Sequence, residues 1–542
     1  MSKDRKNSTG TDSMTSSERS SHRSSYEEDY SPHYSNGQKK SSGGSQGGGG
    51  SQGKKVKKSK KKHTFGKFLA VLQGILSLVV LGLLLYLDVL PDKYVIVVAA
   101  LMLILWIFAY FSQYTRKTHM AGKVESVILS IVLAFASYYL VSTNIFLGDV
   151  TSSSIKVDSI VIVVLDDDPA ETLADAADYT FGIQSTIDRT NVDSTIEQIN
   201  ENLGQEITTQ EYDGLYEQVS ALYSGEVGAI IYNEAFNENI TEDFETFEED
   251  IRILENVKIE TEVAVDASDL EVTEEPFTIY ITGIDTYGDI STTGRSDVNI
   301  LVTVNPSTKQ ILLTTTPRDY YVEFPGVTNG ELDKLTHAGI YGVDCSVSTL
   351  EELYGIDIDY YAKVNFTSVV ELVDLLGGIT VYSEYAFTAS SADYSFVEGY
   401  NDLDGEAALA FVRERKNLEG GDNQRGKNQM AVITALIQKA VSPSILKNYS
   451  SILSTLSGNF ETNMDTEDIT ALVKMQLSDE AEWNIVSQSV TGTDSTDYCY
   501  SSPGQLLYVM VPDEESVAEA SAQIQAVLDG EILEEGTSSA GD

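Results

Sequence analysis

The chain has 542 residues, enough for two or three domains, and a net charge of −47 that is divided unevenly along its length. Residues 1–123 carry 19 basic and 8 acidic side chains, whereas the rest of the chain carries 17 basic and 75 acidic ones. Because so acidic a surface repels DNA and anionic lipid, the composition argues against nucleic-acid binding by the large C-terminal part.

Residues 1–64 have the composition of a disordered tail. They are rich in Ser, Gly, Gln and Lys and nearly lack large aliphatic side chains, so they cannot bury a core. The tail ends in the basic run Lys54–Lys62, a pattern also seen in nuclear signals and nucleic-acid patches. Because an apolar segment follows at once, we interpret the run as a cytoplasmic flank that faces anionic lipid.

Residues 65–148 contain three uncharged apolar runs, each close to the roughly 20 residues that a helix needs to cross a membrane. The runs are Phe68–Leu87, Tyr94–Tyr114 and Ser126–Gly148. Basic residues gather in the tail and in the loop after the second run, so the positive-inside rule places both in the cytoplasm. Three spans then put everything after residue 148 outside the cell.

Residues 149–275 combine strand and helix patterns, which predicts a small α/β accessory domain outside the cell. We expect strands at Ser159–Leu165 and Val227–Tyr232, and helices at Ser194–Leu203 and Tyr212–Tyr223. This segment is highly acidic and contains few candidate catalytic residues.

Residues 276–530 alternate short strands with amphipathic helices, a pattern that predicts a second, layered α/β domain; an acidic tail, residues 531–542, follows. The expected strands are Phe277–Thr282, Val298–Val304, Gln310–Thr316, Tyr360–Val364, Ile379–Val381 and Leu506–Val511. The expected helices are Val347–Tyr354, Ser368–Leu376, Glu406–Arg413, Lys427–Ala440 and Glu514–Leu528.

Arginines are concentrated in this second domain. Of the seven arginines after residue 124, five lie between residues 295 and 425, each at a strand end, a loop or a helix end. They are Arg295, Arg318, Arg413, Arg415 and Arg425. Planar, permanently charged guanidinium groups suit bidentate binding of phosphate, and ligands of open α/β sheets bind at the loops beyond strand ends. The grouping predicts a site for a phosphorylated ligand.

Aspartates accompany these arginines. Asp285 and Asp319 follow strands and Asp297 precedes one, which suits a Mg²⁺ ion that bridges carboxylate and phosphate oxygens. The alternative is that neighbours such as Arg318 and Asp319 form structural ion pairs that hold loops. Residues two apart do not share a helix face, so either the helix ends near Arg413 or one member of the pair Arg413 and Arg415 points away from the ligand.

Other chemistries have little support in the sequence. His337 is the only histidine after residue 148, so a His-rich zinc site is excluded, and a Ser-His-Asp triad would have to use this residue. No phosphate loop of the Gly-x-x-x-x-Gly-Lys-Ser/Thr type is present. Cys345 and Cys499 either form a disulfide outside the cell or are small buried side chains.

The motifs of residues 276–440 resemble the LytR-CpsA-Psr family, and the three spans with an intervening domain resemble its capsule-type branch. The matching segments are Gly283–Asp285, Gly294–Asp297, Thr316–Asp319, Lys334–Ala338, Asp359–Tyr361, Lys363–Phe366, Val373–Gly378, Leu403–Ala407, Arg413–Lys416, Gly421–Asp422 and Arg425. One departure is visible: the family often has a second basic residue three positions after Arg425, where this chain has Asn428.

The resemblance implies a layered α-β-α catalytic domain in a bacterial plasma-membrane protein. Family members are taken to transfer a glycopolymer from a polyprenyl-pyrophosphate carrier to peptidoglycan. Carried over, Asp285 and Asp297 would bind Mg²⁺, and the five arginines would clamp the pyrophosphate. Asp422 would orient arginines or assist the acceptor hydroxyl, and Arg318, Arg413, Asp422 and Arg425 would form the catalytic set.

The resemblance also implies a Mg²⁺-dependent phosphotransferase, with pyrophosphatase activity as a side reaction. One alternative is a non-catalytic membrane sensor or transcriptional attenuator that binds the lipid-linked glycopolymer. Another is a structural wall anchor in which the arginines only tie loops together.

Overall fold

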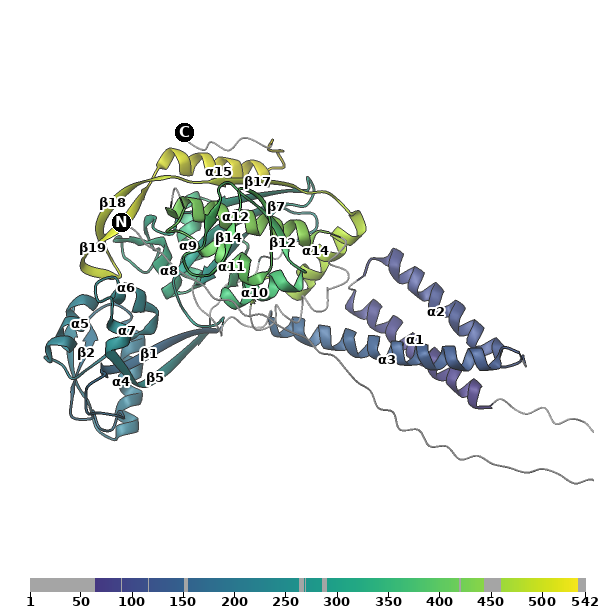
Figure 1. Cartoon of the computed structure of the whole chain (residues 1–542), viewed down its shortest axis with the longest axis horizontal. Coiled ribbons are helices and arrows are strands. Elements are labelled where there is room, and N and C mark those ends of the chain that lie inside the picture. Colours follow the sequence, from purple (N-terminus) through teal and green to yellow (C-terminus); the bar gives the residue numbers. More distant parts are fainter. Residues whose placement is uncertain are drawn as a thin grey trace, which may run out of the picture. The chain divides into compact units, whose positions relative to one another are not determined.

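The computed structural model describes residues 64–88, 90–115, 117–150, 155–262, 268, 270–284, 290–418, 421–442 and 460–534 (Figure 1). For residues 142–150, 262, 422 and 423 it describes the backbone alone.

Three long apolar helices open the described chain. They are α1 (Thr64–Leu87), α2 (Asp92–Ser112) and α3 (His119–Val150). Each contains a stretch long and apolar enough to cross a membrane, and in α3 this stretch is His119–Val141. The three predicted spans thus correspond to three helices. The helices contact one another through a small cluster that includes Val80, Leu84 and Leu133.

The accessory domain is built on a five-stranded sheet in the order β3-β2-β4-β1-β5. The strands are β1 (Ile155–Leu165), β2 (Thr180–Gln184), β3 (Thr208–Tyr212), β4 (Ala229–Asn233) and β5 (Ile251–Glu262). Alternate residues of β1 face opposite sides, so Val161 packs in the cluster that contains α5 (Leu215–Ser224) and Ile162 in the cluster that contains α4 (Arg189–Leu203). Short helices follow β4: η1 (Glu234–Phe236), α6 (Asn237–Thr241) and α7 (Phe247–Asp250).

The starts of two helices in this domain differ from the prediction, since the expected helix Ser194–Leu203 begins earlier, at Arg189. The expected helix Tyr212–Tyr223 begins at Leu215, because Gly214 is extended (φ −145°, ψ 163°) and Tyr212 is the last residue of β3. The side chain of Tyr212 is partly buried on a parallel strand pair, and this packing overrides its place in an apparent helical pattern.

The second domain contains a six-stranded sheet in the order β16-β11-β6-β7-β8-β17. The strands are β6 (Phe277–Ile284), β7 (Ser296–Asn305), β8 (Gln310–Thr315), β11 (Tyr360–Val364), β16 (Phe460–Thr462) and β17 (Asn484–Ser489). The pairs β6–β11 and β8–β17 are parallel, and the pairs β6–β7, β7–β8 and β11–β16 are antiparallel. The sheet is therefore mixed.

Helices cover both faces of this sheet (Figure 1). On one face, Leu301 and Leu312 pack in a cluster with α9 (Val343–Tyr354) and α15 (Glu514–Leu528). On the other, Ile300 and Val302 pack with α12 (Gly421–Ala440) and α14 (Thr466–Asp479). Because both faces are covered, the central strands read as nearly continuous hydrophobic runs. The predicted α-β-α layering is confirmed.

A helical subregion packs beside α12. Its helices are α10 (Phe366–Leu375) and α11 (Gly405–Arg413), and its short strand pairs are β12 (Ile379–Ser383) with β15 (Gly399–Leu403) and β13 (Phe387–Thr388) with β14 (Ser395–Phe396). Asn365 caps α10 by accepting from Ser368 N at 3.0 Å, and Asp404 caps α11 by accepting from Ala407 N at 2.9 Å. These caps fix where the two helices begin beside the sheet.

The remaining elements complete the edge of this domain. They are β9 (Tyr321–Glu323), β10 (Leu332–Lys334), α8 (Leu335–Tyr341), β18 (Gly492–Cys499) and β19 (Ser502–Pro512). The expected helix Lys427–Ala440 is part of a longer helix, since α12 begins at Gly421. Cys345 and Cys499 are buried and unpaired, so no disulfide joins them, and burial raises the pKa of the Cys345 thiol to about 12.

Candidate active site

The candidate site is a cavity of about 850 Å³ beside the ends of β6 and β11 and the start of β7. All five predicted arginines line it, although they come from four separate segments of the chain. The arginines are Arg295, Arg318, Arg413, Arg415 and Arg425. Asp297 lies among them. The sequence grouping of arginines therefore corresponds to one place in the fold.

Arg318 and Asp297 form the best-defined pair of the site. Arg318 Nη1 donates to both carboxylate oxygens of Asp297 at 2.8 Å, and Thr336 Oγ1 donates to Asp297 Oδ1 at 2.9 Å. Burial alone would raise the pKa of Asp297, but the guanidinium groups of Arg318, Arg295 and Arg425 outweigh burial and hold this pKa well below its usual range. Asp297 is therefore ionised at any physiological pH.

Arg295 is a strongly desolvated cation of the cavity. Its side chain is 9% exposed, and burial lowers the pKa of its guanidinium to about 10, with a further contribution from the nearby charges of Arg318 and Arg415. Its Nε is buried and has no hydrogen-bond partner among the described residues. A buried charged donor without a partner favours an anionic ligand at this position.

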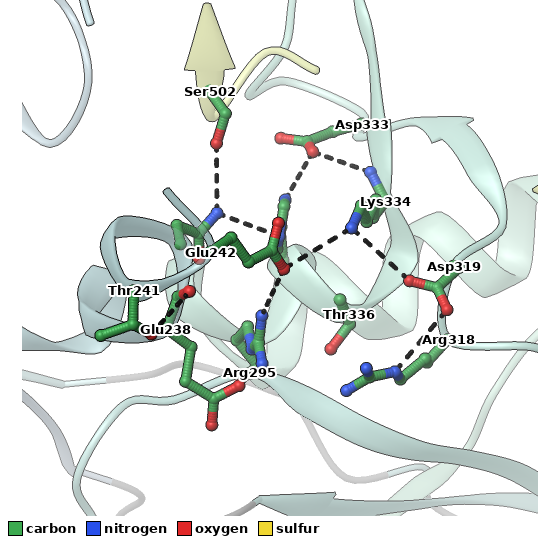
Figure 2. A network of polar contacts seen from close by, with 12 residues as sticks. Glu238, Thr241, Glu242, Arg295, Arg318, Asp319, Asp333, Lys334, Thr336 and Ser502 are labelled. Atoms are coloured by element: carbon green, nitrogen blue, oxygen red, sulfur yellow. Dashed lines mark hydrogen bonds and ion pairs between the residues drawn. The ribbon is translucent and has the colours of Figure 1, made fainter. Parts of the chain in front are cut away.

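Carboxylates of the accessory domain reach the same guanidinium (Figure 2). Glu238 forms an ion pair with Arg295 Nη2, and Glu242 Oε1 lies 3.7 Å from Arg295 Nη1 and 3.9 Å from Lys334 Nζ. Lys334 Nζ in turn lies 3.7 Å from Asp319 Oδ1, and Asp319 Oδ2 lies 3.7 Å from Arg318 Nε. Opposite charges thus alternate from the accessory domain to Arg318.

The end of α11 explains how Arg413 and Arg415 share a cavity. The helix ends at Arg413, and Glu414 is extended (φ −65°, ψ 131°). The buried Glu414 carboxylate accepts from the backbone N–H groups of Arg415 at 3.0 Å and Asn417 at 2.8 Å, which fixes this turn. Arg413 lies over the ring of Phe366 at 3.9 Å, a cation–π contact. Of the two sequence alternatives, the one in which the helix ends is correct.

Part of the cavity wall is apolar. This wall is formed by Ile284, Val298, Val364, Phe366, Val369, Leu409 and Val412. A cavity that joins several guanidinium groups to an aliphatic surface matches a ligand with an anionic head and a hydrocarbon tail.

Two predicted site residues cannot be placed. Asp285 lies outside the described residues, although Gly283 and Ile284 before it line the cavity. Asp422 belongs to α12 by its backbone, but its side chain lies outside what the structure describes. Their predicted roles therefore stay predictions.

The described residues contain no group of three or more His, Cys, Asp or Glu side chains that could hold a metal ion. Asp297 on its own fits Mg²⁺, because it stays ionised and borders the cavity. Mg²⁺ commonly takes one or two carboxylates together with water and substrate phosphate oxygens.

His337 is not placed for a Ser-His-Asp triad. Its side chain is fully buried, with Nδ1 2.6 Å from Asp333 Oδ1 and Nε2 3.1 Å from Asn239 Nδ2. The partner of Nε2 is an amide rather than a hydroxyl nucleophile, so this histidine joins parts of the fold.

Sequence reasoning missed the accessory-domain residues of the site. Glu238, Thr241, Glu242 and Glu245 line the cavity from α6 and the residues after it. The spacing of Glu238 and Glu242 was the available signal, since residues four apart share a helix face. In so acidic a segment this spacing did not stand out.

Comparison with known proteins places most of the second domain in one family. The sequence model of the LytR_cpsA_psr family matches residues 240–524. The polyisoprenyl-teichoic acid–peptidoglycan teichoic acid transferase TagU of Enterococcus faecalis is 38% identical over 198 residues, which cover 36% of this chain and 64% of that relative, slightly less than two thirds. TagU of Bacillus licheniformis is 33% identical over 256 residues, which cover 47% of this chain and 78% of the relative. The crystal structure of TagV from B. subtilis is 31% identical with a TM-score of 0.41, over 47% of this chain and 98% of that one.

Proposed function

Because this chain belongs to the LytR-CpsA-Psr family, we propose that it transfers a glycopolymer from a polyprenyl-pyrophosphate carrier to peptidoglycan during cell-wall assembly. The observation that carries the proposal is the cavity that combines five arginines with an aliphatic wall. The arginines suit the pyrophosphate, and the wall suits the first isoprene units of the carrier. The relatives named as teichoic acid transferases support this class of reaction.

We propose that the reaction is a phosphoryl transfer. The acceptor hydroxyl oxygen attacks the phosphorus next to the glycopolymer and forms a new P–O bond. The bond from this phosphorus to the bridging oxygen breaks, and polyprenyl phosphate leaves with that oxygen. The hydroxyl proton passes to a base, for which we propose Asp422. The product is a phosphodiester between glycopolymer and peptidoglycan.

The arginines would act through charge and position. Phosphoryl transfer needs alignment and neutralisation of the equatorial oxygens more than a covalent catalyst. Arg318 would bind phosphate with its geometry already set by Asp297, so little reorganisation is needed when the ligand arrives. Arg413 is held in position by its cation–π contact with the ring of Phe366. From the end of α11, it would contact the same phosphate group as Arg318.

We propose Mg²⁺ as the cofactor, with Asp297 and Asp285 as its protein ligands. The ion would supply further charge neutralisation at the pyrophosphate oxygens. The ionised state of Asp297 at the cavity edge supports its part in this proposal. Hydrolysis of the lipid pyrophosphate, with water in place of the acceptor hydroxyl, would be a side reaction of the same site.

We propose that the protein is anchored in the bacterial plasma membrane by α1, α2 and α3. The basic tail would lie in the cytoplasm, and both folded domains would lie outside the cell, where peptidoglycan is. The polymer would be a capsular polysaccharide or a teichoic-acid-like chain. The three helices and the accessory domain, which resemble the capsule-type branch of the family, favour the former.

The test uses the purified full chain in detergent, an oligosaccharide linked to a short polyprenyl pyrophosphate, and soluble peptidoglycan fragments. We expect Mg²⁺-dependent formation of a phosphodiester-linked product, and a loss of about 100-fold in rate for Arg318→Ala and for Arg413→Ala. Binding without turnover would support the sensor alternative instead. Full activity of both variants would rule out the arginine clamp.

A further inference from the structure

The short helix α6 fixes the accessory domain against the second domain. Asn239 is 4% exposed, and its Nδ2 lies 3.1 Å from His337 Nε2 and donates to Ser502 Oγ at 3.2 Å. His337 is held by Asp333, which also accepts from the backbone N–H of Ser501 at 2.8 Å. A buried polar network of this kind holds α6 in one position relative to the cavity.

From this fixed helix, two carboxylates extend to the cavity. Glu238 and Glu242 are four residues apart, so they lie on one helical face, and both border the cavity. Glu238 forms an ion pair with Arg295, and Glu242 lies between Arg295 and Lys334. The two Nη groups of Arg295 are therefore directed at carboxylates of the accessory domain.

The two partners of each ion pair differ in exposure to solvent. The Arg295 side chain is 9% exposed, whereas Glu238 is 47% and Glu242 is 38% exposed. The guanidinium is confined by packing, but each carboxylate can rotate into water and regain its hydration at small cost. An incoming phosphate group needs the same donors of Arg295.

We infer that Glu238 and Glu242 compete with the phosphorylated ligand for Arg295. The carboxylates of the accessory domain occupy this arginine until the ligand displaces them. This inference rests on the proposed function, since it concerns the same cavity. Displacement costs the ligand part of its binding free energy. The transfer leaves a polyprenyl monophosphate, which has fewer phosphate oxygens than the substrate. Because this product competes less well for Arg295, the carboxylates return to the arginine and favour product release. They are thus groups of the accessory domain that set how tightly the cavity holds a phosphorylated ligand.

The test measures binding of farnesyl pyrophosphate and farnesyl monophosphate to the full chain in detergent, by calorimetry and by dissociation rate. Loss of a competing carboxylate should strengthen binding, so Glu238→Gln and Glu242→Gln should each bind both probes about two- to fivefold more tightly. The gain should come from slower dissociation. Glu238→Asp, which keeps the charge, should stay close to the native affinity.

Glu249→Gln is the matched control, because Glu249 is an exposed residue of α7 in the same domain and carries the same charge, but is not among the residues that line the cavity. Unchanged or weaker binding by Glu238→Gln and Glu242→Gln would overturn the inference. An equal gain for Glu249→Gln would also overturn it, because the effect would then be one of overall charge. If the native chain binds neither probe, the proposed function itself fails. Melting curves of each variant check that it is folded.

Discussion

At the scale of single residues, the site depends on charges that are buried in pairs. Asp297 holds Arg318 with two hydrogen bonds, and both side chains are about 15% exposed or less. A buried charge that loses its partner is expensive, because neither water nor another group replaces the lost interaction. The pair therefore contributes to folding as well as to ligand binding.

The first prediction concerns this pair. Asp297→Asn should lower the free energy of unfolding by about 2–3 kcal/mol, because the Arg318 charge loses its counterion. Denaturant unfolding of the full chain in detergent measures this. Asp319→Asn is the control and should cost less, since Asp319 lies 3.7 Å from Arg318 rather than 2.8 Å. Equal losses for the two variants would contradict the assignment of Asp297 as the main partner.

The depressed pKa of Asp297 also determines how its contribution to folding stability changes with pH. A carboxyl whose folded pKa is depressed contributes stability above its unfolded pKa and loses it as pH falls through the folded value. Because the folded pKa of Asp297 is held well below the usual range, its contribution stays intact between pH 5 and 8 by this principle. Any change of stability with pH in that range must come from other groups.

Asp188 of the accessory domain is such a group. Burial, together with the neighbouring Asp158 carboxylate, raises the pKa of Asp188 to about 6, despite hydrogen bonds from Asn233 and Asn191. A raised folded pKa contributes stability at low pH that is lost as pH rises through about 6.

The second prediction follows from this shift. The native chain should lose about 1–3 kcal/mol of this contribution as pH rises from about 4 to 7. In Asp188→Asn this part of the pH dependence should be absent. The asparagine suits the backbone, because Asp188 has a positive φ of 51°, a conformation that asparagine tolerates. Melting temperatures at several pH values test this, and parallel profiles for the two proteins would contradict it.

At the scale of elements, α6 is important because its buried Asn239 joins the two domains. The third prediction is that Asn239→Ala lowers the free energy of unfolding by about 1–3 kcal/mol, since it leaves the buried His337 and Ser502 groups without this partner. Thr241→Ala is the matched control, because Thr241 Oγ1 donates within α6 to the Glu238 carbonyl at 3.1 Å. Equal losses of stability in the two variants would contradict the claim that Asn239 holds the two domains together.

The elements also show what sequence reasoning could predict. The long hydrophobic strands β1, β6, β7 and β8 were predicted because burial on both faces leaves continuous apolar runs. The start of α12 was missed, because its first residues are Gly421, Asp422 and Asn423, which have low helix propensity. Strands of two or three residues, such as β13 and β16, give no periodic signal and form only through pairing.

For the site, the arginines were predictable and the carboxylates were not. Five arginines in a strongly acidic region depart from the local composition, so their grouping was visible without a structure. Glu238 and Glu242 match their acidic surroundings, and their role depends on docking between domains that are separate in sequence. The only local signal of this pairing was the four-residue spacing of Glu238 and Glu242, which did not stand out in so acidic a segment.

At the scale of the whole molecule, the proposed topology rests on three helices that are long and apolar enough to cross a membrane, because an odd number of spans would place the tail and the folded domains on opposite sides. The native cysteines give a low background for labelling, because burial raises the pKa of both thiols and both side chains are buried. Single cysteines introduced on either side of the helices can therefore report topology.

The fourth prediction uses Ser45→Cys in the N-terminal tail and Glu201→Cys on an exposed position of α4. In intact cells, a membrane-impermeant maleimide should label Glu201→Cys and should label Ser45→Cys only after permeabilisation. The reverse pattern would mean that both folded domains face the cytoplasm, where peptidoglycan is not available as an acceptor.

The central claim is that the arginine-lined cavity binds a polyprenyl pyrophosphate. The most direct test is mass analysis of lipid that co-purifies with the full chain from its native membrane, compared with Arg318→Ala. We predict a polyprenyl-pyrophosphate-linked glycan with the native chain and a loss of about tenfold or more with the variant, since a charge-assisted hydrogen bond contributes about 1.5–3 kcal/mol. Absence of such a lipid from the native chain, or equal amounts with the variant, would contradict the claim.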